Sequence, residues 1–167
     1  MDIENAKTLI SYCGLFCGSC GIYKGRIVAM LAKDLKELIE AYNYPEWVPE
    51  YGGIDFNFNE FLKGLEYFIK DNSKCYGQVS CIKGCGMPGC KIKECAKKRS
   101  VELCFECDNF PCDNFLQFGK EWRTIMTKEH DILKKLGKDE WIKMHIQQAE
   151  KGYCNATKKY YSKGKVE

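Results

Sequence analysis

The sequence predicts a mainly α-helical protein whose helices pack around irregular loops rich in cysteine. Two observations predict this fold class. Apolar residues recur at three- and four-residue spacing in several stretches outside the cysteine-dense region, which is typical of amphipathic helices. The dense region, residues 75–112, holds eight of the twelve cysteines together with several glycines, so most of it is expected to be loop. A chain of 167 residues suits one domain, residues 1–167, with 75–112 as a subdomain.

The first expected helix spans residues 24–42. Its apolar side carries Ile27, Val28, Leu31, Leu35, Leu38, Ile39 and Tyr42. Pro45 and Pro49 are expected to end it and to open an aromatic-rich loop that runs to about residue 57. A second helix is expected over 58–70, with Asn57 as its N-cap and Glu60 three residues later. Its expected buried stripe is Phe58, Phe61, Leu62, Leu65 and Phe68.

Further helices are expected on the C-terminal side of the dense region. A short one spans 92–99, and a helical pattern follows Cys112 and ends at Gly137. The last helix, over 139–151, places Trp141, Ile142, His145 and Ala149 on one side. Residues 154–167 read as a polar, lysine-rich tail, which is expected to be solvated.

Composition and compartment decide how the cysteines are interpreted. The net charge of +3 gives no basic stripe, so nucleic-acid binding is only weakly supported. No stretch approaches the roughly 18 apolar residues of a membrane span, and the acidic N-terminal residues do not resemble a signal peptide. A cytoplasmic location is therefore expected. In a reducing cytosol, twelve cysteines indicate metal ligands or redox chemistry rather than disulfides.

Eleven of the cysteines are candidate metal ligands. Thiolates suit zinc and iron–sulfur clusters, and a Cys-x-x-Cys turn directs two sulfurs toward one ion. The candidates are Cys13, Cys17, Cys20, Cys75, Cys81, Cys85, Cys90, Cys95, Cys104, Cys107 and Cys112. The simplest division by order puts residues 75, 81, 85 and 90 in one zinc site and residues 95, 104, 107 and 112 in another. Cys154 is left out and is expected to be a free thiol.

The N-terminal group Cys13, Cys17 and Cys20 has more than one interpretation. It can join a fourth cysteine of the dense region in a structural site, or form a three-cysteine site with an open position. Its spacing also looks like the cluster loop of radical enzymes that use S-adenosylmethionine. Cys17 and Cys20 alone resemble a thioredoxin-like redox pair. The strand–helix alternation of those two folds is missing.

Other familiar chemistry finds no support in the sequence. There is no phosphate-binding loop, no GxGxxG and no GxSxG. The two histidines, His130 and His145, have no near histidine partner and are expected to pack rather than to bind metal. Whether the protein is an enzyme stays open.

Three stretches together resemble a known family. They are residues 11–20 (SYCGLFCGSC), 90–96 (CKIKECA) and 104–112 (CFECDNFPC). They are similar to small cysteine-rich bacterial and archaeal proteins classed as a domain of unknown function. The resemblance implies a cytosolic prokaryotic protein with bound metal, zinc above all, and implies no activity. Some relatives look as if they end in a second Cys-x-x-Cys turn, whereas here Cys154 is followed at that spacing by Thr157.

Two functional classes follow. The first is a structural-zinc binding module, in which the loops present the aromatic segment and the basic patch Lys91, Lys93, Lys97, Lys98 and Arg99 to an unknown protein or small molecule. The alternative is an iron–sulfur or thiol redox protein in which Cys13, Cys17 and Cys20 carry the chemistry. The absence of a recognisable general base or cofactor motif favours the first.

Overall fold

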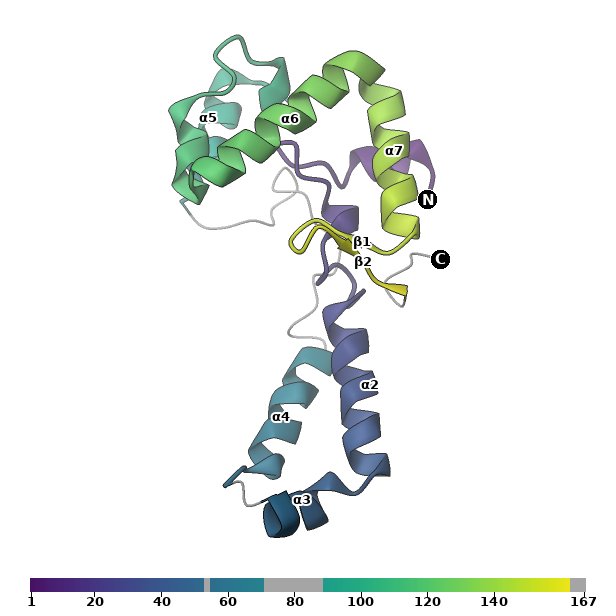
Figure 1. Ribbon diagram of the computed structural model, residues 1–167. Helices are drawn as coiled ribbons and strands as arrows, with labels where there is room; N and C mark the ends of the chain where they lie inside the picture. The colour runs from purple at the N-terminus through teal and green to yellow at the C-terminus, as the bar shows by residue number, and fades with distance from the viewer. Residues whose placement is uncertain (53–54, 71–88, 163–167) are drawn as a thin grey trace.

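The computed structural model of this chain describes residues 1–52, 55–70 and 89–162 and confirms a mainly α-helical protein. Its regular elements are α1 (Ile3–Lys7), η1 (Cys17–Ser19), α2 (Val28–Ala41), α3 (Tyr44–Gly52), α4 (Phe58–Ile69), α5 (Lys91–Arg99), η3 (Cys104–Glu106), η4 (Asp113–Phe118), α6 (Lys120–Leu136), α7 (Lys138–Glu150), β1 (Tyr153–Cys154) and β2 (Lys159–Tyr160). The part with α5, α6 and α7 also holds α1 and the β1–β2 hairpin, and α2, α3 and α4 extend away from it (Figure 1).

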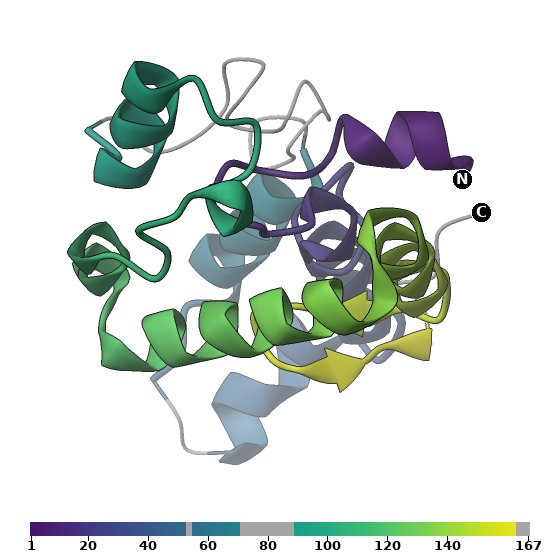
Figure 2. The same cartoon turned by 90° about the horizontal axis from the view of Figure 1, so that it is seen from above.

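The larger core lies in the part that contains α5, α6 and α7. Trp141 and Ile142 of α7 are fully buried, as are Phe16 and Phe115 to within a few per cent. The N-terminal segment runs through this core, and the two-stranded β1–β2 hairpin lies beside α7 (Figure 2). Hydrophobic burial of this kind is the main term that holds such a core together. The core therefore unites residues from the two ends of the chain.

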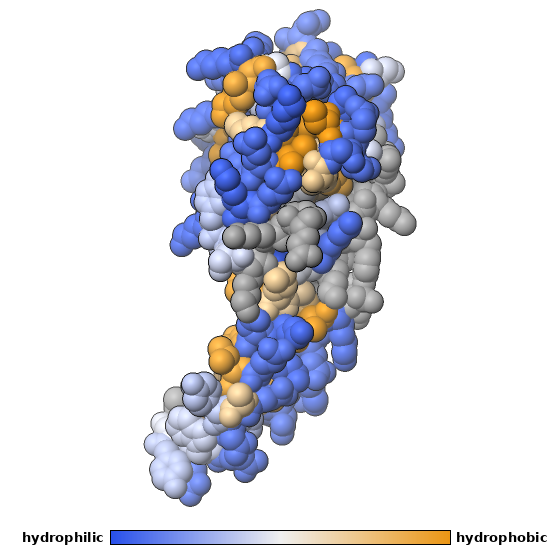
Figure 3. All heavy atoms as spheres, turned by 90° about the vertical axis from the view of Figure 1, so that its right-hand side faces the viewer, coloured by the Kyte–Doolittle hydropathy of each residue, from blue (hydrophilic) through white to orange (hydrophobic). Residues whose placement is uncertain are grey.

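A smaller, separate core joins α2 to α4. Ala32 and Ile39 of α2 pack with Leu65 of α4. One part of the expected apolar side of the first helix is therefore buried against α4, and the other part is exposed. Its most regular stripe points outward, and Leu31, Leu35, Leu38 and Tyr42 are 44–64% exposed. Figure 3 shows hydrophobic surface on the helical hairpin of α2 and α4 as well as on the part that contains α5, α6 and α7. Helical periodicity located the apolar residues but did not identify which of them α4 covers.

The second helix keeps its place but not all of its expected burial. Among the expected stripe, Leu65 is buried and Phe61 and Leu62 are partly buried. Phe68 is 44% exposed and lies edge-on to Tyr67 rather than in the core. The stripe is narrower than expected because α4 packs mainly against α2, with a smaller contact to α3.

The expected loop after Pro45 contains a helix, which corrects the sequence prediction. Residues Tyr44–Gly52 form α3, with Pro49 inside it. Proline is tolerated in the first turn of a helix, where its missing N–H would have no partner, so Pro45 does not prevent a helix from starting there. Pro49 removes one internal hydrogen bond from a helix of nine residues. The aromatic contacts of Tyr44 with Tyr42 and Trp47 accompany this turn.

The expected polar tail begins as a hairpin. Cys154 of β1 pairs with Lys159 of β2, and Cys154 is buried. Gly152 has a φ of +87°, and a Cβ built there would stand 2.0 Å from the carbonyl oxygen of Tyr161. Only glycine permits this approach of two backbone segments. The packing of residues 153–160 thus depends on contacts that no local pattern reveals.

Several expected elements are confirmed. The Asn57 side chain accepts a hydrogen bond from the Glu60 amide at 3.1 Å and caps α4. The short helix expected over 92–99 is α5, and Gly137 with a φ of +78° ends α6. The expected inner side of the last helix is buried in α7. Among the residues that the structure describes, no helix is long and apolar enough to cross a membrane.

Candidate metal-binding site

Two cysteine turns share one backbone shape. Elements η1 and η3 are short 3-10 turns, each preceded by an extended, buried residue, Phe16 or Leu103. In each turn the amide of the second cysteine donates to the carbonyl of the first, Cys20 to Cys17 at 2.9 Å and Cys107 to Cys104 at 3.1 Å. This tight geometry is what allows a Cys-x-x-Cys pair to bind one ion.

The segment of residues 9–12 connects the two turns. The Cys17 amide donates to the Leu9 carbonyl at 2.8 Å, and the Cys104 amide donates to the Tyr12 carbonyl at 2.7 Å. Gly14 follows with a φ of +88°, and a Cβ built on it would stand 2.3 Å from the Phe105 ring. The two turns are therefore fixed by the same stretch of backbone.

Four of the predicted ligands line one small cavity. Cys95 comes from α5, Cys104 and Cys107 from η3, and Cys112 from the start of η4. The cavity has a volume of about 20 Å³, and its other walls are mostly apolar side chains that include Ile92 and Phe115. A space of this size holds about one water molecule or ion. These four cysteines are the second group that sequence order suggests.

The thiol of Cys104 is in an environment that disfavours its negative charge. Burial, and then the proximity of the thiols of Cys13, Cys112, Cys95 and Cys107, raise its pKa to about 12. A bound cation reverses this balance, because it attracts every thiolate around it. The Arg99 guanidinium also lines the cavity and reaches the Cys107 sulfur at 4.0 Å.

The sulfurs line the cavity without forming a coordination shell. Within residues 1–52, 55–70 and 89–162, no three histidine, cysteine, aspartate or glutamate side chains stand in an arrangement that could hold a metal ion. The donor set nevertheless fits zinc or iron in its chemistry, since four thiols in apolar surroundings match a closed four-cysteine site. Metal binding there requires the sulfurs to move toward a common centre.

The other predicted ligands occupy different surroundings. The Cys13 sulfur lies 3.1 Å from the Ser11 hydroxyl, and burial raises its pKa. Cys90 is near enough to Cys13 to affect that pKa, and its sulfur accepts from the Gln117 amide at 3.7 Å. Cys17, the first residue of η1, and Cys20, its C-cap, are partly buried. Cys75, Cys81 and Cys85 lie outside the described residues, so only Cys90 of the first suggested group can be placed.

The structure also reveals a close contact between a buried histidine and a partly buried carboxylate, which sequence analysis missed. The His145 Nε2 of α7 lies 3.2 Å from the Glu129 carboxylate of α6, and the Trp141 indole donates to the same carboxylate at 3.3 Å. Phe16 stacks on the His145 ring at 5.6 Å between centroids. His130 packs against Phe105 and Phe110. Both histidines lie in packed surroundings, as sequence analysis expected.

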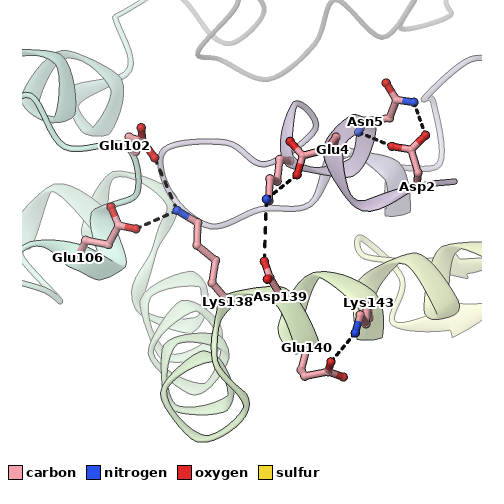
Figure 4. Close-up of polar contacts among 10 residues, drawn as sticks. Asp2, Glu4, Asn5, Glu102, Glu106, Lys138, Asp139, Glu140 and Lys143 are labelled. Atoms are coloured by element: carbon pink, nitrogen blue, oxygen red, sulfur yellow. Dashed lines mark hydrogen bonds and ion pairs between the residues drawn. The ribbon is translucent and has the colours of Figure 1, made fainter.

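Ion pairs at the surface connect the start of α7 to the segment that contains the η3 turn. Lys138, the first residue of α7, lies 3.1 Å from Glu106, the last residue of η3, and 3.6 Å from Glu102, which precedes this turn (Figure 4). Each of these pairs is exposed and therefore contributes little alone. Together they orient the start of α7 toward the turn that carries Cys104 and Cys107.

Comparison with known proteins places the chain in a family. A family model described as "Protein of unknown function (DUF3795)" matches residues 9–117. No curated protein and no solved structure matches the chain. The matched region begins at the backbone segment that connects the two cysteine turns and includes all four cysteines of the cavity. Since the match covers more than half of the sequence, the chain belongs to this family of cysteine-rich proteins of unknown function.

Proposed function

We propose that this protein is a metal-binding module that holds a structural zinc ion at Cys95, Cys104, Cys107 and Cys112. The observation that carries the proposal is that these four thiols, from three successive elements, line one small cavity. Two of them occupy a Cys-x-x-Cys turn, and the cavity is otherwise largely apolar. Zinc favours four thiolates of this kind in a closed site.

The residues around the cavity would prepare it for the ion. The Tyr12 carbonyl and the Phe105 ring hold the η3 turn, and α5 presents Cys95 from a regular helix. When bound, zinc supplies cross-linking and charge compensation for the thiolates. In zinc-finger peptides this contribution is about 10 kcal/mol or more. Folding of this region is therefore expected to be coupled to metal binding.

The proposed role is binding to a partner rather than catalysis. The helix α5, which contributes Cys95 to the cavity, also carries Lys93, Lys97 and Lys98, of which Lys97 and Lys98 are exposed and Lys93 is half-buried. A zinc-fixed α5 would present these lysines to an acidic protein or small molecule in the cytoplasm. The alternative, an iron–sulfur or thiol redox protein that uses Cys13, Cys17 and Cys20, predicts a different metal.

Elemental analysis of Cys104→Ser and Cys107→Ser tests the proposal. We expect each variant to lose about one equivalent of zinc relative to the wild type, because a four-thiolate site does not survive loss of one ligand. The matched control is Val101→Ala, which alters the wall of the same cavity without removing a thiol.

Full zinc content in both cysteine variants would overturn the assignment. Iron with acid-labile sulfide and a visible absorption band in anaerobically purified wild type would favour the redox alternative instead. A loss of zinc in the control equal to that in the cysteine variants would show that packing, and not ligation, was being measured.

A further inference from the structure

Cys154 lies directly against the N-terminal cysteine turn. The Asn155 amide donates to the Ser19 carbonyl at 3.0 Å, which joins the β1–β2 hairpin to η1. The Cys154 sulfur is 3.4 Å from the position that a Cβ on Gly21 would occupy, and Gly21 is the residue after Cys20. The Cys154 side chain is also buried, with 4% exposure. A residue 134 positions from Cys20 in the sequence thus adjoins it in the fold.

The Cys154 sulfur has several polar neighbours. Thr157 and Ala156 donate hydrogen bonds to it, and Arg26 lies near enough to interact with its charge. The backbone turns tightly here, since the Lys158 amide donates to the Cys154 carbonyl at 2.9 Å. Several donors directed at one sulfur are also what a metal-bound thiolate requires from its neighbours.

Arg26 connects the two cysteine segments. Its guanidinium is buried and donates to the carbonyls of Gly18 at 2.9 Å and Tyr153 at 2.7 Å, one in each segment. The thiols of Cys20 and Cys154 are both near enough to interact with its charge. Three thiolates around a divalent ion carry one net negative charge, and a buried cation beside them offsets the cost of burying it.

We propose that Cys154 joins Cys17 and Cys20 in a three-thiolate site for one soft divalent metal ion such as zinc. This site is separate from the cavity of Cys95, Cys104, Cys107 and Cys112, although it rests on the proposed use of thiols for metal binding. Binding replaces the remaining thiol protons with the metal and releases them to solvent. Among the described residues these three sulfurs do not yet form a coordination shell, so the Cys154 turn has to close on η1 as the ion binds. A fourth position then stays open to an exogenous ligand.

The test compares Cys20→Ser, Cys154→Ser and the double variant by zinc analysis and by the absorption of the cobalt-substituted proteins. We expect each single variant to lose about one equivalent, and the double variant to lose the same one and no more, because all three thiols serve one ion. Ser19→Ala is the matched control, since it alters the same turn and its buried hydroxyl has no hydrogen-bond partner among the described residues.

The outcomes separate this proposal from the previous one. Full metal content in Cys154→Ser, with one equivalent lost in Cys104→Ser, would overturn the second site and leave the first intact. Loss of two equivalents in the double variant would also overturn it.

A second experiment uses the wild-type protein alone and so does not depend on whether a variant folds. The thiols are alkylated with and without zinc, and the modified cysteines are identified by mass spectrometry. Zinc is expected to slow modification of Cys17, Cys20 and Cys154 together, and an unchanged rate at Cys154 would contradict the proposal.

Discussion

At the scale of single residues, Glu129 has the most informative surroundings outside the thiols. Burial by itself would raise its pKa, but hydrogen bonding and charge interaction with His145 outweigh burial, helped by Trp141 and Lys158, and hold the pKa below its ordinary value of 4.5. A carboxylate whose folded pKa is lower than its unfolded pKa stabilises the folded protein above the unfolded value. That contribution is lost as the pH falls through the folded pKa.

We expect Glu129→Gln to lower the free energy of unfolding at pH 7 by about 1–3 kcal/mol, because it leaves a buried histidine without its charged partner. The difference from wild type should shrink as the pH falls below 4.5 and the wild-type carboxylate takes up a proton. Urea unfolding at several pH values measures both effects. Glu106→Gln, which removes an exposed pair with Lys138, is the control and should change stability by at most about 0.5 kcal/mol. A difference that grows toward acidic pH would contradict the assignment.

At the scale of elements, the N-terminus of α4 is stabilised by a capping side chain more than by buried apolar residues. The Asn57 side chain accepts from the Glu60 amide, one of the first amides of the helix that otherwise lack a partner. Only Leu65 of this helix is buried. A helix with so little buried surface relies more than usual on its cap and on its contact with α2.

Asn57→Ala is expected to lower the free energy of unfolding by about 1 kcal/mol, because the Glu60 amide loses its acceptor. Asn57→Asp keeps an acceptor at the same position and should stay close to wild type. Chemical denaturation of the three proteins at one pH measures the difference. Equal stability of the alanine variant and the wild type would show that the cap is not formed in solution.

At the scale of the whole molecule, the protein has two hydrophobic cores of unequal size. The larger one holds the cysteine turns, and the smaller one joins α2 to α4. Leu65 of the smaller core does not belong to the set that surrounds the thiols. The two cores are therefore expected to respond separately to substitution. The prediction that residues 1–167 form one domain stays a prediction.

Leu65→Ala should destabilise the α2–α4 hairpin by about 2–4 kcal/mol through lost burial and the cavity that remains. Hydrogen exchange is expected to accelerate in α2 and α4 and to change little in α7, while zinc content stays at the wild-type level. Tyr67→Ala, at an exposed position of the same helix, is the control. Loss of zinc from the leucine variant would show that the two cores act as one unit.

Local sequence determined most helices and the identity of the candidate ligands. The N-cap at Asn57, the end of α6 at Gly137 and the inner face of α7 follow from chemistry within a few residues, so a single sequence sufficed for them. Sequence order also grouped Cys95, Cys104, Cys107 and Cys112, because these cysteines are close in the chain. Local patterns failed at α3, where proline in a first turn permits a helix.

Tertiary structure alone decided which surfaces are covered and which distant thiols are neighbours. The regular stripe of Leu31, Leu35 and Leu38 faces outward because α4 packs on the adjacent side of α2, a choice that periodicity does not contain. Cys154 lies beside Cys20 because Arg26 and the Asn155 amide join segments from the two ends of the chain. Residue spacing describes one stretch of backbone at a time, whereas burial and ligation depend on contacts between stretches that only the folded chain brings together.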